Sequence, residues 1–518
     1  MKKYFYFLLF SFCFLLIITC TTQPQSGNLT GTVQLAGEAD HSGIIIGIYE
    51  LTTLDPDIDE ANTKWPHIGV IINQHTEFDH RFGTLVKTGE TDASGYFEIK
   101  NIPTGNYNVV AIKDGFGFKY IYEISISDGD NSINEKRKKE KVKSKKADND
   151  EDSSFNLLPL SFNLNKSRAD LILFPETTIT SDITESTTFE SHHHYIIEQD
   201  IIVDDELTIE PGAVIRLNEG VKMSIYGDLT SVGEEDNFIW FTSNDSLFSL
   251  FPSPFSPITS LFEYKVIELD GTLNKQVSFC KFDHAGTGLL NHVNGFSISN
   301  CIFRDSQCGF KTEDVDSTFC SNLLCEEISN EEQAGIYYLQ VDNDLIEKNI
   351  IKNCENGTRL KDGFEGEVRN NYFTNNTCGS ELWDFIGIIK NNEYYQNYWD
   401  IRFTGNVSQE IGSIKITYNN FYSINGVSTF ASYPYESYSP ILINYNNFTS
   451  ENYFLYDRSG TFTIGKTIDA TNNYFNGLEN EVDIKEKIYD KDEDEFSAEI
   501  VVDNFKINKI SNAGILNL

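Results

Sequence analysis

The feature that most constrains this chain is a repeat in its C-terminal part. An asparagine recurs two or three positions before a large apolar residue. The pairs are Asn300 with Phe303, Asn322 with Leu324, Asn349 with Ile351, Asn371 with Phe373, Asn392 with Tyr394, Asn419 with Phe421, Asn446 with Phe448 and Asn473 with Phe475. Their apolar members are 21, 27, 22, 21, 27, 27 and 27 residues apart, and Phe282 adds a further interval of 21. A recurring period of this size is typical of stacked units that bury their apolar sides against one another.

Each repeat has the length of one coil made of three short strands and their turns. Between Tyr195 and Phe241 the apolar residues come in short pulses, such as Ile201-Ile202-Val203 and Leu207-Thr208-Ile209, each followed by turn residues. Strands this short cannot form long hairpins, but coils stacked about 4.8 Å apart pair each strand with its equivalent in the next coil. We therefore predict a parallel β-helix over 166–477. Phe and Tyr fill its bore, and the asparagines form a structural ladder between turns.

The opening coils carry a recognisable motif. The stretch from Val203 to Phe241, notably Leu207-Thr208-Ile209-Glu210-Pro211-Gly212-Ala213-Val214-Ile215, resembles right-handed β-helix repeat proteins related in fold to pectate lyases. The resemblance implies right-handed coils, whereas an activity does not transfer with a fold. At the other end, Leu478, Val482 and Ile488 have helix-like spacing. We expect 478–518 to be a cap and tail, because an uncapped coil exposes a strand edge.

A different pattern precedes the repeat, over 28–165. The run Thr91-Asp92-Ala93-Ser94-Gly95-Tyr96-Phe97, followed by Pro103-Thr104-Gly105-Asn106-Tyr107, reads as strand, turn, strand and a second tight reversal. It resembles the carboxypeptidase regulatory-like family of prealbumin-type β-sandwiches, whose hallmark is T-D-x-x-G-x-F followed by P-x-G-x-Y. The resemblance implies a structural or binding appendage without an active site. The predicted fold class is all-β, a small β-sandwich followed by a right-handed parallel β-helix.

Two insertions interrupt the predicted sandwich. Residues Leu51 to Arg81 are rich in Asp, Asn and His, and we interpret them as a solvated loop or an extra hairpin. The histidines at 67, 75 and 80 lack metal-ligand spacing. Residues 135–152 hold a block of lysines followed by a block of carboxylates. Like charges at this density cannot pack, so this segment is predicted to be disordered.

The N-terminus has the features of an export signal. Met1-Lys2-Lys3 precedes an apolar run from Tyr4 to Ile18, and Ile17-Ile18-Thr19-Cys20 resembles a bacterial lipobox. The resemblance implies that residues 1–19 are a lipoprotein signal peptide and that Cys20 carries the lipid. Residues 20–27 form a short tether. The protein is then held to a membrane of the cell envelope, at the outer membrane or the cell surface.

Charge and cysteine content exclude several classes of protein. The formal net charge of -38 would repel nucleic acid, so no nucleic-acid partner is predicted. Of nine cysteines, seven lie between Cys280 and Cys378, an odd number without zinc-like CxxC pairs. We interpret them as small apolar residues of the stack. No cofactor and no metal site is predicted.

An active site is only weakly indicated. Polygalacturonase-like enzymes carry N-T-D, D-D, G-H-G and R-I-K blocks, and this chain has only Asp204-Asp205. The remaining catalytic candidates lie in the middle coils, and for each a solvated turn is the simpler interpretation. They are Asp283, His284, Asp305, Asp314, Asp316, Asp384, Asp400 and Arg402.

The densest aromatic run could stack on sugar rings, although the bore competes for part of it. It consists of Tyr394, Tyr395, Tyr398 and Trp399. The leading hypothesis is therefore a non-catalytic surface lipoprotein that binds a polysaccharide or a protein along its β-helix. A polysaccharide lyase or glycoside hydrolase on the same scaffold is the rival hypothesis. A purely structural envelope component is the third.

Overall fold

A computed structural model describes residues 25–133, 171–244, 266–271, 274–330, 333–383, 385–404, 414–429, 441–457, 467–493, 495 and 497–516. The predicted signal peptide, Cys20, the charged insertion 135–152 and Asp384 lie outside these residues. The described residues form two compact units, 25–52 with 78–175 and 53–77 with 176–516.

The first unit contains two small sheets around one apolar cluster. The strands are β1 (Ser26–Thr32), β2 (Gln34–Leu35), β3 (Ile45–Glu50), β4 (Leu85–Glu90), β5 (Tyr96–Pro103), β6 (Gly105–Ile112), β7 (Lys119–Ile126), β8 (Gly129–Ser132) and β9 (Ile172–Leu173). One sheet has the order β5-β1-β8 and the other β4-β3-β6-β7, while β2 pairs with β9. Phe97 of β5 and Val109 of β6 come from different sheets and are both buried in the apolar cluster that the two sheets share. The predicted turn is present, with the N–H of Gly95 donating to the carbonyl of Asp92 at 2.9 Å. Gly95 has a φ of 82°, which favours glycine there.

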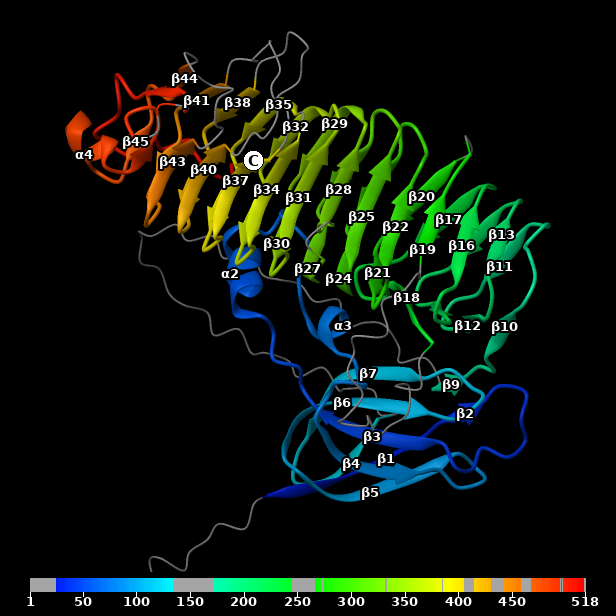
Figure 1. Cartoon of the computed structure of the whole chain (residues 1–518). Helices are drawn as coiled ribbons and strands as arrows, with labels where there is room; N and C mark the ends of the chain where they lie inside the picture. The colour runs from blue at the N-terminus through cyan, green and yellow to red at the C-terminus, as the bar shows by residue number, and fades with distance from the viewer. Residues whose placement is uncertain are drawn as a thin grey trace, which may run out of the picture. The chain divides into compact units, whose positions relative to one another are not determined.

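The β-helix consists of three parallel sheets, to which successive coils contribute one strand each (Figure 1). The first sheet contains β10 (Thr177–Ile179), β12 (His194–Ile197), β15 (Val214–Leu217), β18 (Ile239–Ser243), β21 (Cys280–Asp283), β24 (Ile302–Ser306), β27 (Leu324–Ile328), β30 (Ile350–Lys352), β33 (Tyr372–Thr374), β36 (Glu393–Tyr395), β39 (Asn420–Tyr422), β42 (Asn447–Phe448) and β45 (Tyr474–Phe475). The second sheet contains β11 (Thr187–Phe189), β14 (Leu207–Ile209), β17 (Leu229–Val232), β20 (Lys275–Ser278), β23 (Ser297–Ser299), β26 (Phe319–Ser321), β29 (Asp342–Glu347), β32 (Glu365–Arg369), β35 (Ile386–Lys390), β38 (Ile414–Thr417), β41 (Ile441–Asn444), β44 (Thr467–Asp469) and β47 (Glu499–Val501). The third sheet contains β13 (Ile201–Val203), β16 (Lys222–Ile225), β19 (Val266–Leu269), β22 (Thr287–Asn291), β25 (Cys308–Glu313), β28 (Ile336–Leu339), β31 (Asn356–Lys361), β34 (Cys378–Trp383), β37 (Trp399–Phe403), β40 (Asn425–Thr429), β43 (Tyr453–Asp457) and β46 (Ile488–Tyr489). The predicted right-handed parallel β-helix is confirmed.

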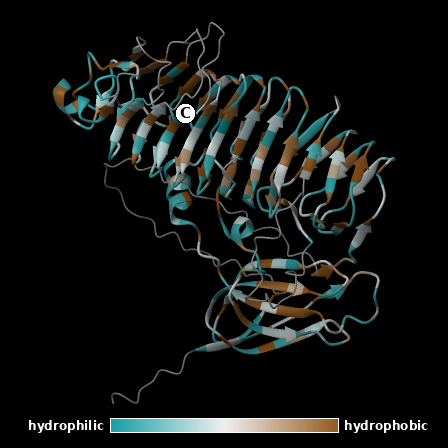
Figure 2. Cartoon of the chain, viewed as in Figure 1, coloured by the Kyte–Doolittle hydropathy of each residue, from teal (hydrophilic) through white to brown (hydrophobic). Residues whose placement is uncertain are grey.

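The bore is filled as the repeat predicts. Apolar and polar residues alternate along the strands, as the colours of Figure 2 show, and Phe303, Phe373 and Phe448 share one continuous core. Their rings stack on those of neighbouring coils, with Phe282 and Phe303 centroids 4.9 Å apart. One position differs from the prediction, because Cys325 and not Leu324 pairs with Phe303 in the register. Leu324 instead faces outward into a second apolar cluster.

The asparagine ladder is present in six of the eight predicted coils. Asn349, Asn371, Asn392, Asn419, Asn446 and Asn473 are fully buried. In each consecutive pair the side-chain Nδ2 donates to the next Oδ1, over 2.9 to 3.1 Å. Asn300 and Asn322 lie one residue earlier in the turn, at φ 55° and 54°. The predicted pattern therefore combined two different turn positions. Asparagine favours one of them because its side chain forms hydrogen bonds there, and the other because it tolerates a positive φ.

The composition of the insertion between β3 and β4 predicted a solvated loop or an extra hairpin, but the structure shows neither. Residues 53–77 belong to the second unit and contain the helices α2 (Pro56–Lys64) and α3 (Gln74–Glu77). Asp55 caps α2, accepting from the N–H groups of Asp57 and Ile58, and Pro56 occupies the first turn. The helix forms because Ile58 and Ala61 reach an apolar partner on the β-helix, which the polar composition concealed.

The stack also continues past Phe475, the predicted end of the coils. Strands β46 and β47 add to the third and second sheets. A short helix, α4 (Glu481–Lys485), lies in the segment where helix-like spacing was noted. In the part of the chain that the structure covers, no helix has the length and apolar character needed to cross a membrane.

Candidate functional site

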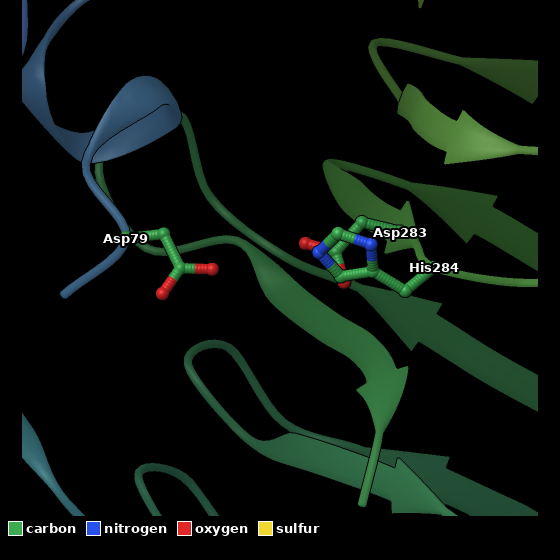
Figure 3. Close-up of side chains that lie close together, drawn as sticks. All are labelled: Asp79, Asp283 and His284. Atoms are coloured by element: carbon green, nitrogen blue, oxygen red, sulfur yellow. The ribbon is translucent and has the colours of Figure 1, made fainter. Parts of the chain in front are cut away.

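The structure brings three of the predicted catalytic candidates into adjacent coils. Asp283 ends β21 and His284 follows it in the turn (Figure 3). Asp305 lies one coil further on, and the N–H of His284 donates to the carbonyl of Arg304 at 3.3 Å. Asp283 accepts from the indole N–H of Trp240 at 2.7 Å and lies 3.7 Å from the ammonium of Lys281.

These contacts give Asp283 a structural task. Lys281 also donates to the carbonyl of Thr76, in the insertion, at 3.3 Å. In the next coil Arg304 binds the carboxylate of Glu77 at 2.8 Å and also that of Glu326. The outward charges of β21, β24 and β27 therefore hold the insertion to the first sheet. The cavity beside Asp283 and His284 measures about 10 Å³, which is room for a single water rather than for a sugar.

The other acidic candidates lie elsewhere. Asp314 and Asp316 are exposed turn residues. Asp400 is fully buried, and its Oδ1 accepts from Nδ2 of Asn397 at 3.2 Å. Burial raises the pKa of Asp400 well above its usual value, against hydrogen bonds from Ser423 and Asn397. Inside the bore the neutral form of this carboxyl is therefore favoured, and the group cannot meet a substrate.

Asp400 stands in a column that the sequence analysis missed. Its equivalents in the two neighbouring coils are Gly379 and Gly426, and four earlier coils also carry glycine there. These are Gly288, Gly309, Gly335 and Gly357. A Cβ on Gly357 would lie 2.4 Å from the carbonyl oxygen of Gly379. The glycines allow the coils to approach closely, a signal that a search at the same repeat period would have found.

Arg402 is a salt-bridge residue on the outer face of the third sheet. It donates to Oε1 of Glu381 at 2.9 Å, while Arg359 binds Oε2 of the same carboxylate at 2.8 Å. Five steps of the first sheet separate β21 from β36, the strand before Asp400. At about 4.8 Å per step this amounts to roughly 24 Å. Asp283 and Asp400 therefore cannot act as a glycosidase pair, which needs carboxyls about 5 to 10 Å apart.

The aromatic candidates divide between the bore and the surface. Tyr394 is fully buried and stacks on Phe373, with centroids 4.7 Å apart, so it cannot bind a ligand. Tyr395 is 39% exposed on the first sheet, and Tyr398 is 51% exposed in the following turn. Tyr398 meets the ring of Trp399 edge to face at 5.5 Å.

Trp399 belongs to a larger group of rings on the side of the third sheet. Its centroid lies 5.7 Å from that of Tyr456, which lies 5.1 Å from Tyr453 and 4.8 Å from Tyr489. We call Tyr398, Trp399, Tyr453, Tyr456 and Tyr489 the aromatic strip. Its last three members were not predicted, because they come from coils of unequal length and share no short motif.

The outer face of the first sheet is covered by the second unit's own segments. Ile302, Leu324, Ile350 and Tyr372 pack with Ile58, Trp65 and Ile515 in one apolar cluster. Further along, the C-terminal tail binds the sheet through amide side chains. Asn447 donates to the carbonyl of Ile510 at 3.0 Å and accepts from its N–H at 2.8 Å. By contrast, the strands of the third sheet face the viewer in Figure 1 with no described helix across them.

The fold and the site define the class of this protein. It is a β-helix protein whose bore is filled with side chains, whose candidate carboxyls lie far apart, and which carries a strip of aromatic rings on its surface. A family model described as periplasmic copper-binding protein (NosD) matches residues 255–454, which is less than half of the chain. No curated protein and no solved structure matches the chain. The chain is thus similar over its middle coils to a family described as periplasmic, in keeping with the cell-envelope location predicted from the sequence.

Proposed function

We propose that this protein is a non-catalytic cell-envelope lipoprotein that binds a glycan on the side of the third sheet. The observation that carries the proposal is the aromatic strip. Trp399, Tyr456 and Tyr489 come from three different coils, yet their rings form an unbroken series of contacts. Aromatic faces arranged over several coils suit a polymer whose sugar rings recur along its length.

The placement of the catalytic candidates supports a non-catalytic role. Asp283 is held by Trp240 and Lys281, Arg402 by Glu381, and Asp400 is inside the bore. The rival hypothesis of a lyase or hydrolase requires a carboxyl pair or an arginine base that is accessible to a polymer. Among the candidates that the structure describes, Asp283, Asp400 and Arg402 do not supply it.

Copper binding, which is part of the matched family's description, is not included in the proposal. Copper(I) prefers thiolate ligands, and all seven cysteines from Cys280 to Cys378 are buried. Burial is the largest cause that raises the pKa of Cys308 to about 11 and that of Cys320 to about 12. These thiols therefore stay protonated inside the stack.

Glycan arrays and titration calorimetry with the full chain test the binding. Trp399→Ala should weaken binding at least about tenfold, as expected for an aromatic anchor. Tyr395→Ala is the matched control, because Tyr395 is an exposed tyrosine of the same coil on the first sheet. If the array and a pull-down both return nothing, the chain is a structural component and the binding proposal fails. Release of unsaturated products or reducing ends from polysaccharides would instead favour the enzyme hypothesis.

The anchor is a separate part of the proposal. It rests on the lipobox at Ile17-Ile18-Thr19-Cys20, and it includes the outer membrane as the place of attachment. The first unit, as a carboxypeptidase regulatory-like domain, is proposed to be a spacer between the lipid and the β-helix. Metabolic labelling with a radioactive fatty acid should mark the wild type and not Cys20→Ala. Labelling of both chains, or of neither, removes the anchor.

A further inference from the structure

Two tyrosines occupy a backbone position that suits them poorly. In the turn from the second to the first sheet, one residue per coil has a positive φ, between 50° and 62° from Phe279 to Asn472. Five of these nine positions hold asparagine, at 300, 322, 370, 391 and 472, since its short polar side chain tolerates the left-handed region. Tyr418 and Tyr445 have φ of 59° and 61° with a bulky side chain. Strain kept in two successive coils is an observation that points to a function.

The two rings form a short platform. Their centroids are 5.4 Å apart and their planes differ by 10°. The neighbouring coils place Asn391 and Asn472 at the equivalent positions, so the stack ends at these two rings. Tyr445 is 39% exposed.

The C-terminal tail makes the other wall of a pocket over this platform. Tyr418, Tyr445 and residues 505–512 line a shallow pocket, widely open to solvent, of about 600 Å³, a size within the range of small-molecule sites. The tail is fixed on both sides of the pocket. The N–H of Lys506 donates to the carbonyl of Asn473 at 2.7 Å, and that of Gly514 donates to the carbonyl of Tyr418 at 2.7 Å. Between them Asn447 holds both backbone groups of Ile510. The pocket is therefore preorganised.

The pocket is positively charged in a protein of net charge -38. The ammonium of Lys506 donates to Oδ1 of Asn472 at 3.0 Å, and that of Lys509 donates to the hydroxyl of Tyr422 and lies 4.7 Å above its ring. Both partners are neutral, and within the described residues no ion pair includes either lysine. Lys509 also acts electrostatically on the buried carboxyl of Glu393, beyond ion-pair distance. Neither lysine is therefore held in an ion pair, and both can meet an anionic ligand.

We propose that this pocket binds an acidic sugar residue of a glycan. The sugar ring stacks on the Tyr418–Tyr445 platform, and its carboxylate or sulfate meets Lys506 and Lys509. Asn508, Ser511 and Asn512 also line the pocket, and their amides and hydroxyl would serve the sugar hydroxyls. This inference rests on the proposed function, since it names the class of glycan and adds a second site to the aromatic strip.

The test uses titration calorimetry on the full chain with oligosaccharides that carry uronic acid, sialic acid or sulfate, each beside its neutral counterpart. The decisive variant is the double substitution Tyr418→Asn and Tyr445→Asn. Because asparagine is the common residue at this turn, the variant should keep its circular dichroism spectrum and its melting temperature or raise the latter. It should lose at least about tenfold in affinity for the acidic ligand. Lys506→Gln with Lys509→Gln should lower the affinity for the acidic ligand, not for the neutral one, and flatten its salt dependence.

The outcomes separate the two proposals. Binding of an acidic ligand that survives the double tyrosine variant but is lost in Trp399→Ala overturns this inference and leaves the proposed function standing. Equal affinity for acidic and neutral partners also overturns it. If the wild type binds none of the oligosaccharides, this inference falls, and the proposed function falls with it only if the glycan array and the pull-down are also negative. Loss in the double tyrosine variant with full binding in Trp399→Ala supports the pocket and removes the aromatic strip.

Discussion

The same coils build the outer faces of the first and third sheets, but the two faces differ in whether another segment of the chain covers them. On the first sheet Ile302, Leu324 and Ile350 point outward and are covered by Trp65 and its neighbours from the insertion. On the third sheet the equivalent outward positions carry ion pairs and aromatic rings, such as Glu381 between two arginines. The first sheet also carries outward charges, but Arg304 and Lys352 pair with carboxylates of the covering insertion. An apolar outward column beside charges that bind another segment therefore marks a face that the chain covers itself, whereas charges paired within the sheet mark a face left to solvent or a ligand.

The largest expected effect comes from removing the covering tryptophan. Trp65 is almost fully buried, and its ring lies 5.3 Å from that of Tyr372. Trp65→Ala should lower the free energy of unfolding of the second unit by about 3 kcal/mol, through lost burial and a cavity. Trp383→Ala is the matched control on the third sheet, where Trp383 is half-buried beside Lys361. It should cost less than about 1 kcal/mol. Urea unfolding followed by tryptophan fluorescence and circular dichroism measures both, and equal costs would contradict the comparison.

A smaller effect is expected from the charges of the two faces. Lys352 is buried between the carboxylates of Asp55, at 2.5 Å, and Asp57, at 2.7 Å. Lys352→Ala leaves both carboxylates without their cation and should cost about 2 kcal/mol, less than a fully buried pair since the aspartates are partly exposed. Arg402→Ala should cost about 1 kcal/mol or less, because Arg359 still binds Glu381. A larger loss for Arg402→Ala in urea unfolding would reverse the ranking of the faces.

The same lysine predicts a pH dependence. Burial raises the pKa of Asp55, but the hydrogen bonds from Lys352 and from the backbone of Ile58 outweigh it, so the pKa of this carboxyl lies below its usual value of 3.8. A lowered carboxyl pKa contributes stability that is present above pH 3.8 and is lost as the pH falls through the folded-state value. Acid should therefore weaken the contact between the insertion and the first sheet. The protection of the α2 amides against hydrogen exchange, relative to the intrinsic rate at each pH, should fall below pH 4 in the wild type and already be low at pH 7 in Lys352→Ala.

Much of the β-helix could be predicted from the sequence, because each coil needs the same kinds of residue at its equivalent positions. The spacing from Phe282 to Phe475 located the bore, and the asparagines located one turn. The prediction missed the glycine column and the second ladder, in which Asn376 donates to Asn397 at 3.0 Å. The glycine column and the second ladder recur with the same period, but no large apolar residue stands at a fixed distance from them in the sequence to draw attention to them.

The covered face could not be predicted, because its two halves are far apart in the chain. Trp65 and Ile515 share one apolar cluster with Tyr372, and nothing local in residues 51–81 signals that partner. The tyrosine pocket was missed for the same reason, since Tyr418 and Lys509 come together only when the tail folds back. Tyr394 lies inside the bore and Tyr395 outside it. Residue type and the alternation of side chains along a strand could not tell which of the two points inward, because that depends on the register of the strand.

The smallest expected effect lies in the bore, where neither face takes part. Asp400 is buried, and burial raises its pKa well above the usual value, so the folded state favours the neutral carboxyl. A raised carboxyl pKa means that stability is greatest below the unfolded-state value and declines as the pH rises through the folded-state value. Asp400→Asn replaces the neutral acid with a neutral amide of the same shape. At low pH, where the carboxyl is protonated in both the folded and the unfolded state, it should change the free energy of unfolding by less than about 1 kcal/mol, and it should remove the decline at higher pH. Urea unfolding from about pH 3.5 to about pH 9 measures this, and glycan binding should be unchanged. A wild-type polysaccharide-cleaving activity that disappears in Asp400→Asn would contradict both the burial of this carboxyl and the non-catalytic function proposed for the protein.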